Sequence, residues 1–251
     1  MLVKTFCGAL MGLEAVTVTV EVSITKGMKF HLTGLADTAV RESYDRIRSA
    51  MFNNGLRMPN MDITVNLSPA DIKKEGSGYD LPLAVGILAS NGQIACDHLE
   101  EYMMVGELGL DGRLQPIRGV LPIAIRARKE RFKGLIVPAQ NVREAAVVNN
   151  LEVYGLESLM DVIRFINGEH YEPTIVDTRK EFFEQQSHFD VDFADVRGQE
   201  SVKRALEVAA AGGHNIIKMC PIIQEHKILD IQIFSIFLCL LQPDFLQKRA
   251  A

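Results

Sequence analysis

The chain has 251 residues, of which 47% are hydrophobic and 24% charged, and it carries a net charge of −5. These values are typical of a globular protein with one or two domains, and they exclude a disordered or fibrous chain. The acidic balance also argues against a strongly basic nucleic-acid binder.

The first predicted elements are two strands and a helix. Residues 16–23 (VTVTVEVS) alternate valine with polar residues, which predicts a half-buried strand. A glycine-containing turn then leads into a second strand over residues 28–32. Asp37 is expected to cap a helix that ends near Asn54.

The outer face of this predicted helix carries three arginines: Arg41, Arg46 and Arg48. They are either a phosphate-binding patch or a solvated helix face. We favour the solvated face, because runs of charge on a helix usually mean only contact with water.

The following elements alternate irregularly between strands and helices. We expect, in order, strand 63–67, a helix capped by Asp80, strand 102–107 and strand 114–117, the last two joined by an Asp-Gly turn. The remaining elements are a helix beginning at Pro122, strand 135–137, a short helix with capping-box spacing at Asn141 and Glu144, strand 151–154, and helix 159–166 capped by Ser158. This order predicts an α/β or α+β two-layer sandwich with a mixed sheet.

Charge marks the predicted domain boundaries. Residues 169–192 contain seven acidic and two basic residues, whereas residues 1–168 contain 19 acidic and 18 basic residues. We therefore expect a domain over 1–168, an acidic linker over 169–192, the start of a second module over 193–217, and a divergent hydrophobic tail over 218–251.

The loop at residues 73–80 (KKEGSGYD) has the small residues and the following helix start that suit an anion site or an activated serine. Neither the GxGxxG nor the GxxxxGK[ST] spacing is present, and the sequence offers Ser77 no recognisable partner base. None of the six histidines has the spacing of a catalytic dyad or a metal pair. We predict no catalytic residue and no metal ligand.

The cysteines indicate the compartment. Cys7, Cys96, Cys220 and Cys239 are widely spaced and form no C-x-x-C pair, which excludes a zinc-ribbon pattern and a disulfide framework. The N-terminal residues also lack the pattern of a signal peptide. A cytoplasmic location is therefore expected.

Three long motifs carry a family resemblance. Residues 66–88 (NLSPADIKKEGSGYDLPLAVGIL), 105–125 (VGELGLDGRLQPIRGVLPIAI) and 135–145 (LIVPAQNVREA) closely resemble the YifB/ComM family, which are bacterial magnesium-chelatase-like AAA+ ATPases. The resemblance covers residues 1 to about 217. It implies that the first domain is of the ChlI type, with a fold like that of the proteolytic domain of Lon-type proteases.

The Lon likeness allows a test for a serine–lysine dyad. Lon-type proteases place the serine in a K-D-G-P-S-A-G loop and the lysine in a G-G-x-K helix start. Aligned on these motifs, Gly78 takes the serine position and Leu121 takes the lysine position. Because glycine has no nucleophile and leucine cannot accept a proton, we predict no peptidase activity. A rescue by Ser77 with Lys73 or Lys74 is the weaker alternative.

Residues 193–217 resemble the start of an AAA+ module. The resemblance implies that Val196, Gly198 and Gln199 are the remnant of the segment beside the adenine, and that a helix over 201–211 precedes the first strand of the ATPase core. A Walker A loop should follow that strand. No glycine occurs after Gly213, so residues 214–251 cannot build a phosphate-cradling loop.

The tail allows three interpretations. In residues 228–241, 11 of 14 residues are Ile, Leu, Phe or Cys. The segment is shorter than the roughly 20 residues of a membrane helix, and it could equally form a buried strand or helix. We favour a third interpretation, that the sequence after Ile217 was never selected for this fold, as after a frameshift upstream of the Walker loop.

Three functions follow from these observations. The leading hypothesis is a YifB/ComM-type ATPase truncated before Walker A, from a family implicated in ATP-dependent DNA branch migration during natural transformation. The alternatives are a non-catalytic protein-interaction module and, less favoured, a Lon-type serine peptidase. The resemblance implies ATP, Mg²⁺, a homo-oligomeric ring and DNA for intact members. For this chain we expect no cofactor and no membrane partner, and its status as an enzyme stays open.

Overall fold

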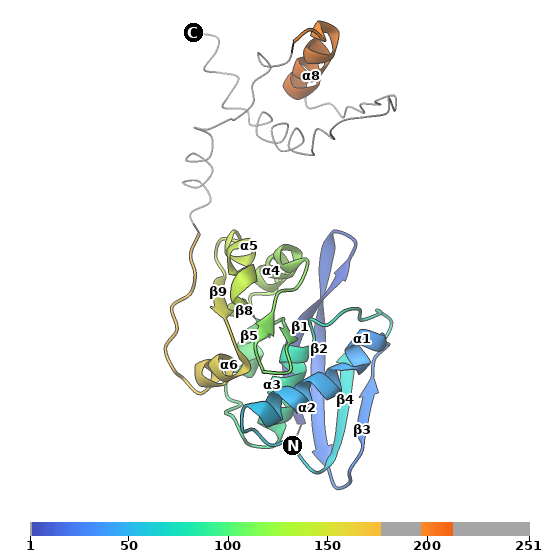
Figure 1. Ribbon diagram of the computed structural model, residues 1–251, viewed down its shortest axis with the longest axis vertical. Coiled ribbons are helices and arrows are strands. Elements are labelled where there is room, and N and C mark those ends of the chain that lie inside the picture. Colours follow the sequence, from blue (N-terminus) through green and yellow to red (C-terminus); the bar gives the residue numbers. More distant parts are fainter. Residues whose placement is uncertain (1, 177–196, 213–251) are drawn as a thin grey trace. The chain divides into compact units, whose positions relative to one another are not determined.

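The computed structural model describes residues 2–176 and 197–212, and these two parts are treated separately. The first part is built on a seven-stranded mixed sheet with the strand order β3-β4-β2-β1-β5-β8-β9 (Figure 1). Its strands are β1 (Leu2–Met11), β2 (Glu14–Thr25), β3 (Phe30–Thr33), β4 (Asp62–Ser68), β5 (Tyr102–Met104), β8 (Gly134–Pro138) and β9 (Glu152–Leu156). A separate two-stranded sheet pairs β6 (Glu107–Leu108) with β7 (Leu114–Gln115).

Seven α-helices are described. They are α1 (Thr38–Arg41), α2 (Ser43–Asn53), α3 (Asp80–Ser90), α4 (Val120–Lys129), α5 (Val142–Ala146), α6 (Leu159–Ile166) and, in the second described part, α8 (Glu200–Gly212). Two short 3-10 helices cover Leu99–Glu101 and Ala139–Asn141. None of the described helices is long and apolar enough to cross a bilayer.

The alternation in β2 directs its buried residues to α3. Val18, Val20 and Val22 are fully buried, and β1 and β4 pair with β2 in antiparallel register on either side. A side chain at Gly86 of α3 would meet Val22, so α3 lies directly against this face. The Thr5 hydroxyl of β1 donates to the Pro82 carbonyl of α3 at 3.0 Å. The predicted strand is confirmed, together with its buried face.

The second face of the same strands is covered by α4. A side chain at Gly8 of β1 would meet Ile123 of α4, and successive residues of a strand point to opposite faces. The mixed α/β class is therefore confirmed. The two-layer prediction holds only toward β3 and β4, where Thr64 is exposed. Toward β8, whose five residues are all buried, helices lie on both faces of the sheet, since Val142 of α5 packs at Gly155 and Phe165 of α6 packs on Tyr154. A continuous apolar run such as that in β8 was the signal for this third layer.

The predicted helix after Asp37 is divided into α1 and α2. The Asp37 carboxylate caps α1 by accepting from the Val40 amide at 2.8 Å. A second helix, α2, begins after its N-cap Glu42 and ends at Asn53, close to the predicted end. The Asn54 amide group donates to the Asp111 carbonyl at 2.9 Å, which ties the end of α2 to the β6–β7 turn.

The cap of α6 was predicted correctly and has a measurable energy. The Ser158 Oγ accepts from the Asp161 amide at 3.3 Å and donates to the Asp161 carboxylate at 2.7 Å. Replacing Ser158 with alanine should lower the free energy of unfolding by about 1 kcal/mol, because a helix N-terminal amide loses its acceptor. Urea unfolding followed by circular dichroism measures this loss. Ser49→Ala, which removes a mid-helix hydroxyl bonded to Asp45, should change stability by less than about 0.5 kcal/mol.

The first residues of the predicted linker lie against the first domain. The Thr174 amide donates to the Val153 carbonyl of β9 at 2.8 Å, and Tyr171 packs on Phe165 with ring centroids 6.0 Å apart. Residues 177–196 and the whole predicted tail lie outside the described residues. The predicted helix over 201–211 is confirmed as α8.

Candidate functional site

The loop before α3 is fixed by backbone contacts to the segment before α1. The Asp37 amide donates to the Lys74 carbonyl at 3.0 Å, and the Lys74 amide donates to the Leu35 carbonyl at 3.1 Å. The Asp37 carboxylate, besides capping α1, accepts from the Gly76 amide at 3.2 Å. The loop is therefore held in one conformation at the N-terminus of α3.

Lys74 does not act as a free base in this loop. Its side chain is buried, and its Nζ donates to the Pro69 carbonyl. Burial lowers the pKa of the Lys74 amine, while the charge of Asp71 opposes this effect. Lys73 is exposed and pairs with Glu75 at 2.6 Å. Neither lysine forms a hydrogen bond to Ser77 among the described residues, so the geometry does not favour the alternative in which Lys73 or Lys74 activates Ser77.

The position aligned with the Lon serine, Gly78, has room for a side chain but carries no reactive group. A Cβ at Gly78 would lie 3.5 Å from Ile117 Cδ1, an ordinary contact, so a serine would fit there. The Gly78 carbonyl accepts from the Gly106 amide at 3.0 Å. Leu121, aligned with the lysine, is the second residue of α4, and its amide donates to the Glu144 carboxylate at 3.1 Å. The loop and the helix start that the resemblance aligns with the Lon dyad are both formed, and the absence of peptidase activity stays a prediction.

Ser77 bonds to a carboxylate instead of a lysine. Its hydroxyl donates to Glu107 Oε2.

Asp80, three residues further on, is fully buried. Its carboxylate accepts from Arg46 Nε at 2.7 Å, from Arg46 Nη2 at 2.9 Å and from the Leu108 amide at 3.1 Å. Burial raises the pKa of Asp80, and the bonds from Arg46 and Leu108 oppose it. The bond to Asp80 raises the pKa of Arg46.

Two predictions about this cluster were wrong. Asp80 does not cap α3, because its carboxylate points to Arg46 and Leu108 rather than to the helix amides. Arg46 does not belong to the solvated face, since it pairs with Asp80 across 34 positions of the chain. Sequence spacing gives no signal for such a long-range pair. A similar error concerns Asn141, whose side chain bonds to Ile117 and does not cap α5.

Cys7 lies beneath the loop, with Sγ 3.9 Å from the Gly78 carbonyl oxygen. The side chain is buried, and burial raises the pKa of the Cys7 thiol to about 12. A thiol with so high a pKa stays protonated at neutral pH, so Cys7 is no substitute nucleophile. The described residues contain no cluster of three or more His, Cys, Asp or Glu residues that could hold a metal ion.

The residues assigned to the adenine segment lie at the start of α8. Val196 lies outside the described residues. Gly198 and Gln199 are exposed and have φ values of 70° and 56°. The Gln199 carbonyl accepts from the Val202 and Lys203 amides at 2.9 and 3.0 Å, so this residue begins the helix. Their role toward a nucleotide stays a prediction.

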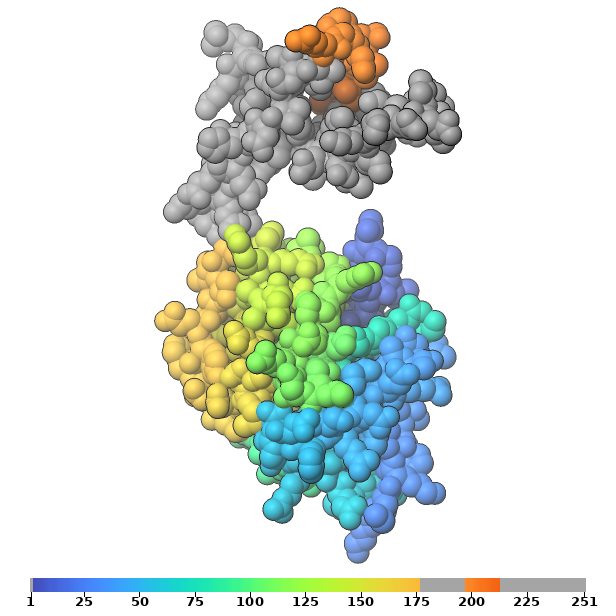
Figure 2. Space-filling model, in the orientation of Figure 1, coloured from blue at the N-terminus to red at the C-terminus, as the bar shows by residue number. Residues whose placement is uncertain are grey.

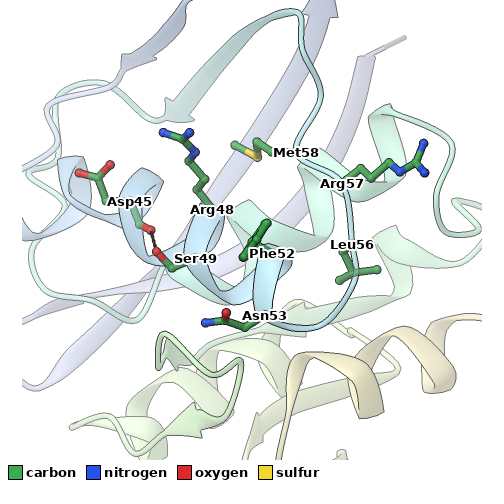
Figure 3. A pocket seen from close by; sticks show the side chains of 8 residues that line it. All are labelled: Asp45, Arg48, Ser49, Phe52, Asn53, Leu56, Arg57 and Met58. Atoms are coloured by element: carbon green, nitrogen blue, oxygen red, sulfur yellow. Dashed lines mark hydrogen bonds between the residues drawn. The ribbon is translucent and has the colours of Figure 1, made fainter.

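A shallow hollow of about 590 Å³ lies beside α2 (Figure 3). It is lined by Asp45, Arg48, Ser49, Phe52, Asn53, Leu56, Arg57 and Met58. Gln93 holds its rim: the Arg57 amide donates to Gln93 Oε1 at 3.1 Å, and Gln93 Nε2 donates to the Arg57 carbonyl at 2.7 Å. No sequence pattern marks this hollow, because it depends on residues that follow the helix.

Comparisons with known proteins agree with the motifs. The family model for subunit ChlI of Mg-chelatase matches residues 20–141, and the model for magnesium chelatase, subunit ChlI, matches residues 192–242. Competence protein ComM of Haemophilus influenzae is 41% identical over 215 residues, which are 85% of this chain and 42% of that protein. YifB of Escherichia coli is 39% identical over 216 residues, 85% of this chain and 41% of that protein. The chain belongs to the YifB/ComM family of magnesium-chelatase-like proteins.

Three further findings bear on this family relation. The chain spans less than half the length of the curated YifB/ComM relatives it matches. The second matched region includes residues 218–242, which are most of the tail for which the sequence predicts a departure from the family. Lon protease 2 of Bacillus subtilis is 23% identical over 162 residues, 57% of this chain and 29% of that protein. This weaker similarity is compatible with the Lon-like frame around Gly78 and Leu121.

Proposed function

We propose that this protein acts in ATP-dependent DNA processing of the kind used in natural transformation, and that its first domain serves there as a non-catalytic assembly and docking module. The proposal is carried by the 41% identity with competence protein ComM over 215 residues. In members of the family that carry the whole ATPase module, ATP and Mg²⁺ would supply the energy, and the working form would be a homo-oligomeric ring on DNA.

The non-catalytic role of the first domain is supported by its chemistry. Gly78 and Leu121 stand where a Lon-type peptidase has its nucleophile and base. The hydroxyl of the preceding residue, Ser77, bonds to Glu107, and burial keeps the Cys7 thiol neutral. The domain keeps a well-packed frame without a reactive pair, which suits a module that binds and positions other parts of an assembly.

We also propose that this 251-residue chain does not hydrolyse ATP by itself. Residues 214–251 contain no glycine. A phosphate-cradling loop needs glycines whose backbone amides approach the phosphates, and its lysine must follow directly. Lys218, Lys227 and Lys248 stand in no such context. The purified chain should release phosphate from ATP no faster than a mock preparation, and a faster release would contradict this part of the proposal.

DNA association tests the proposed role. A fluorescent forked DNA is titrated with the full chain, and anisotropy is recorded at several salt concentrations. Because the first domain is nearly neutral, we expect weak binding whose association constant falls steeply as salt is raised. Binding that is absent even at about 20 mM salt, where phosphate contacts are strongest, would remove the DNA role. The second candidate, a protein-interaction module without DNA, would then be the better description, since large apolar side chains are exposed on this domain.

A further inference from the structure

The tip of the β1–β2 hairpin exposes apolar side chains to an unusual degree. Leu13 is 96% exposed, Met11 is 52% exposed and Leu10 is 45% exposed. The hairpin stands clear of the neighbouring parts of the domain (Figure 2). Glu14 follows Leu13, is exposed, and forms no ion pair within the part of the chain that the structure describes. The tip therefore combines an apolar projection with an unpaired negative charge.

The hollow beside α2 has the complementary properties. Phe52 is 81% exposed, and in Figure 3 its ring lies between Arg48 and Arg57. Both arginines are exposed, and neither guanidinium has an ion-pair partner among residues 2–176 and 197–212. Leu56 and Met58 add apolar walls, and Asp45 is the one carboxylate of the lining. The hollow therefore combines an apolar floor with a surplus of positive charge.

Both features are held rigidly before any contact is made. The β1–β2 ladder continues to its last pair, Met11 with Glu14. The hairpin is tied to α4 through Thr17, whose hydroxyl donates to Glu130 Oε2 at 2.5 Å. The rim of the hollow is fixed by Gln93, as described above. Little conformational entropy would be lost when the two surfaces meet, and this favours association.

The two features lie in different places on one domain. Figure 1 shows the hairpin tip at the end where α4 and α5 lie, whereas α2 crosses the domain nearer the other end. A hairpin tip cannot reach the hollow of its own copy, since both belong to one packed domain. A contact between copies would then be head to tail, leaving a free tip on one side and a free hollow on the other.

We propose that the hairpin tip of one copy docks in the α2 hollow of a second copy, with Leu13 against Phe52 and Glu14 facing Arg48 and Arg57. The inference rests on the assembly role proposed above and names the surface that would perform it. A single tip in a single hollow buries less than a standard interface, so the association is weak and depends on concentration. Repetition of a directional contact yields a closed ring or an open filament.

Complementation between variants tests the direction of the contact. Sedimentation velocity of the full chain should show association that increases with protein concentration. Leu13→Ser, which impairs only the tip, and Phe52→Ser, which impairs only the hollow, should each lower the association constant at least tenfold. A mixture of the two variants should restore a heterodimer, because one intact tip then meets one intact hollow. Met28→Ser, which removes another exposed apolar side chain at a turn (78% exposed), should associate like the wild type.

Charge reversal tests the proposed pairing. Glu14→Arg and the double variant Arg48→Glu/Arg57→Glu should each weaken association, and a mixture of the two should recover part of it. Arg128→Glu, an exposed arginine outside the hollow, serves as the matched control. A wild-type chain that stays monomeric at about 100 μM, well above a micromolar Kd, would overturn the proposal. The proposal would also be overturned if the mixture of variants associated as weakly as each single variant. A Phe52→Ser variant whose association constant equals that of the wild type would overturn it as well. Neither DNA nor ATP enters these measurements, so their outcome is independent of the test of DNA processing.

Discussion

Replacing Arg46 with methionine should lower the free energy of unfolding by about 3–5 kcal/mol at neutral pH, because it leaves the buried Asp80 carboxylate without its cation. Asp80 is fully buried, and without Arg46 its carboxylate keeps only the Leu108 amide as a donor within the described residues. Urea unfolding followed by circular dichroism measures the change. Arg48→Met, which removes an exposed arginine of the same helix without an ion pair, should cost less than about 0.5 kcal/mol.

The loss in the Arg46 variant should depend on pH. Burial already raises the pKa of Asp80, and removal of Arg46 removes the largest opposing interaction. A carboxyl whose pKa is higher in the folded than in the unfolded state favours folding when protonated, so this contribution is lost as pH rises above the unfolded value of about 3.9. The deficit relative to the wild type should therefore be smaller near pH 4 than at pH 7. A deficit that does not change over this range would contradict the assignment of the loss to a buried carboxylate.

Replacing Gly34 with alanine should cost more than about 4 kcal/mol and leave little folded protein, since a typical domain has only 5–15 kcal/mol of stability. The residue has φ +103°, a conformation that residues with side chains rarely adopt. A Cβ there would lie 2.8 Å from the Leu67 carbonyl carbon and closer still to its oxygen. Backbone atoms of a central strand cannot move aside as a flexible side chain can.

Gly12→Ala is the matched control for Gly34→Ala. Gly12 also has a positive φ, +63°, but nothing lies within 4 Å of a Cβ built there. Only backbone strain remains, which costs about 1–2 kcal/mol. Circular dichroism and the urea midpoint of both variants give the comparison. Similar stabilities of the two variants would show that the close approach at Leu67 is not what requires glycine at position 34.

Local signals predicted most elements of the fold. The valine alternation located β2, Ser158 located the start of α6, and the Asp-Gly turn located the β6–β7 hairpin. Asp37 was correctly assigned as a cap. In each case the determining contact lies within a few residues, so spacing along the chain carries the information. The single strand predicted over 102–107 was wrong, because the chain leaves the main sheet after Met104 and the segment is divided into β5 and β6.

Contacts between distant segments could not be predicted in the same way. Asp80 and Arg46 each have a plausible local role, as a cap and as a solvated charge, and only the packing of α2 beside α3 brings them together. Asn141 likewise was predicted to cap the following helix, but its side chain forms two hydrogen bonds with the backbone of Ile117. The hollow beside α2 depends on Gln93, which lies 36 residues beyond Arg57. The spacing of apolar residues predicts which face of an element is buried, but it does not predict which polar side chains form contacts there.

The prediction of no serine–lysine dyad, by contrast, rests on sequence motifs alone. The alignment of Gly78 and Leu121 with the serine and lysine of Lon-type proteases needs only short segments around each position. The structure adds that Gly78 has space for a side chain and that Ile117, near the start of α4, is its nearest neighbour. The prediction of no peptidase activity therefore rests on the residue types at positions 78 and 121 and not on a collapsed site.

Cleavage of fluorescently labelled casein by the purified 251-residue chain tests most directly whether this Lon-like frame is inert. We expect no release of label above that of a mock preparation, because position 78 has no nucleophile and position 121 no base. Ser77→Ala should behave like the wild type. Casein cleavage by the wild-type chain that Ser77→Ala abolishes would contradict the account.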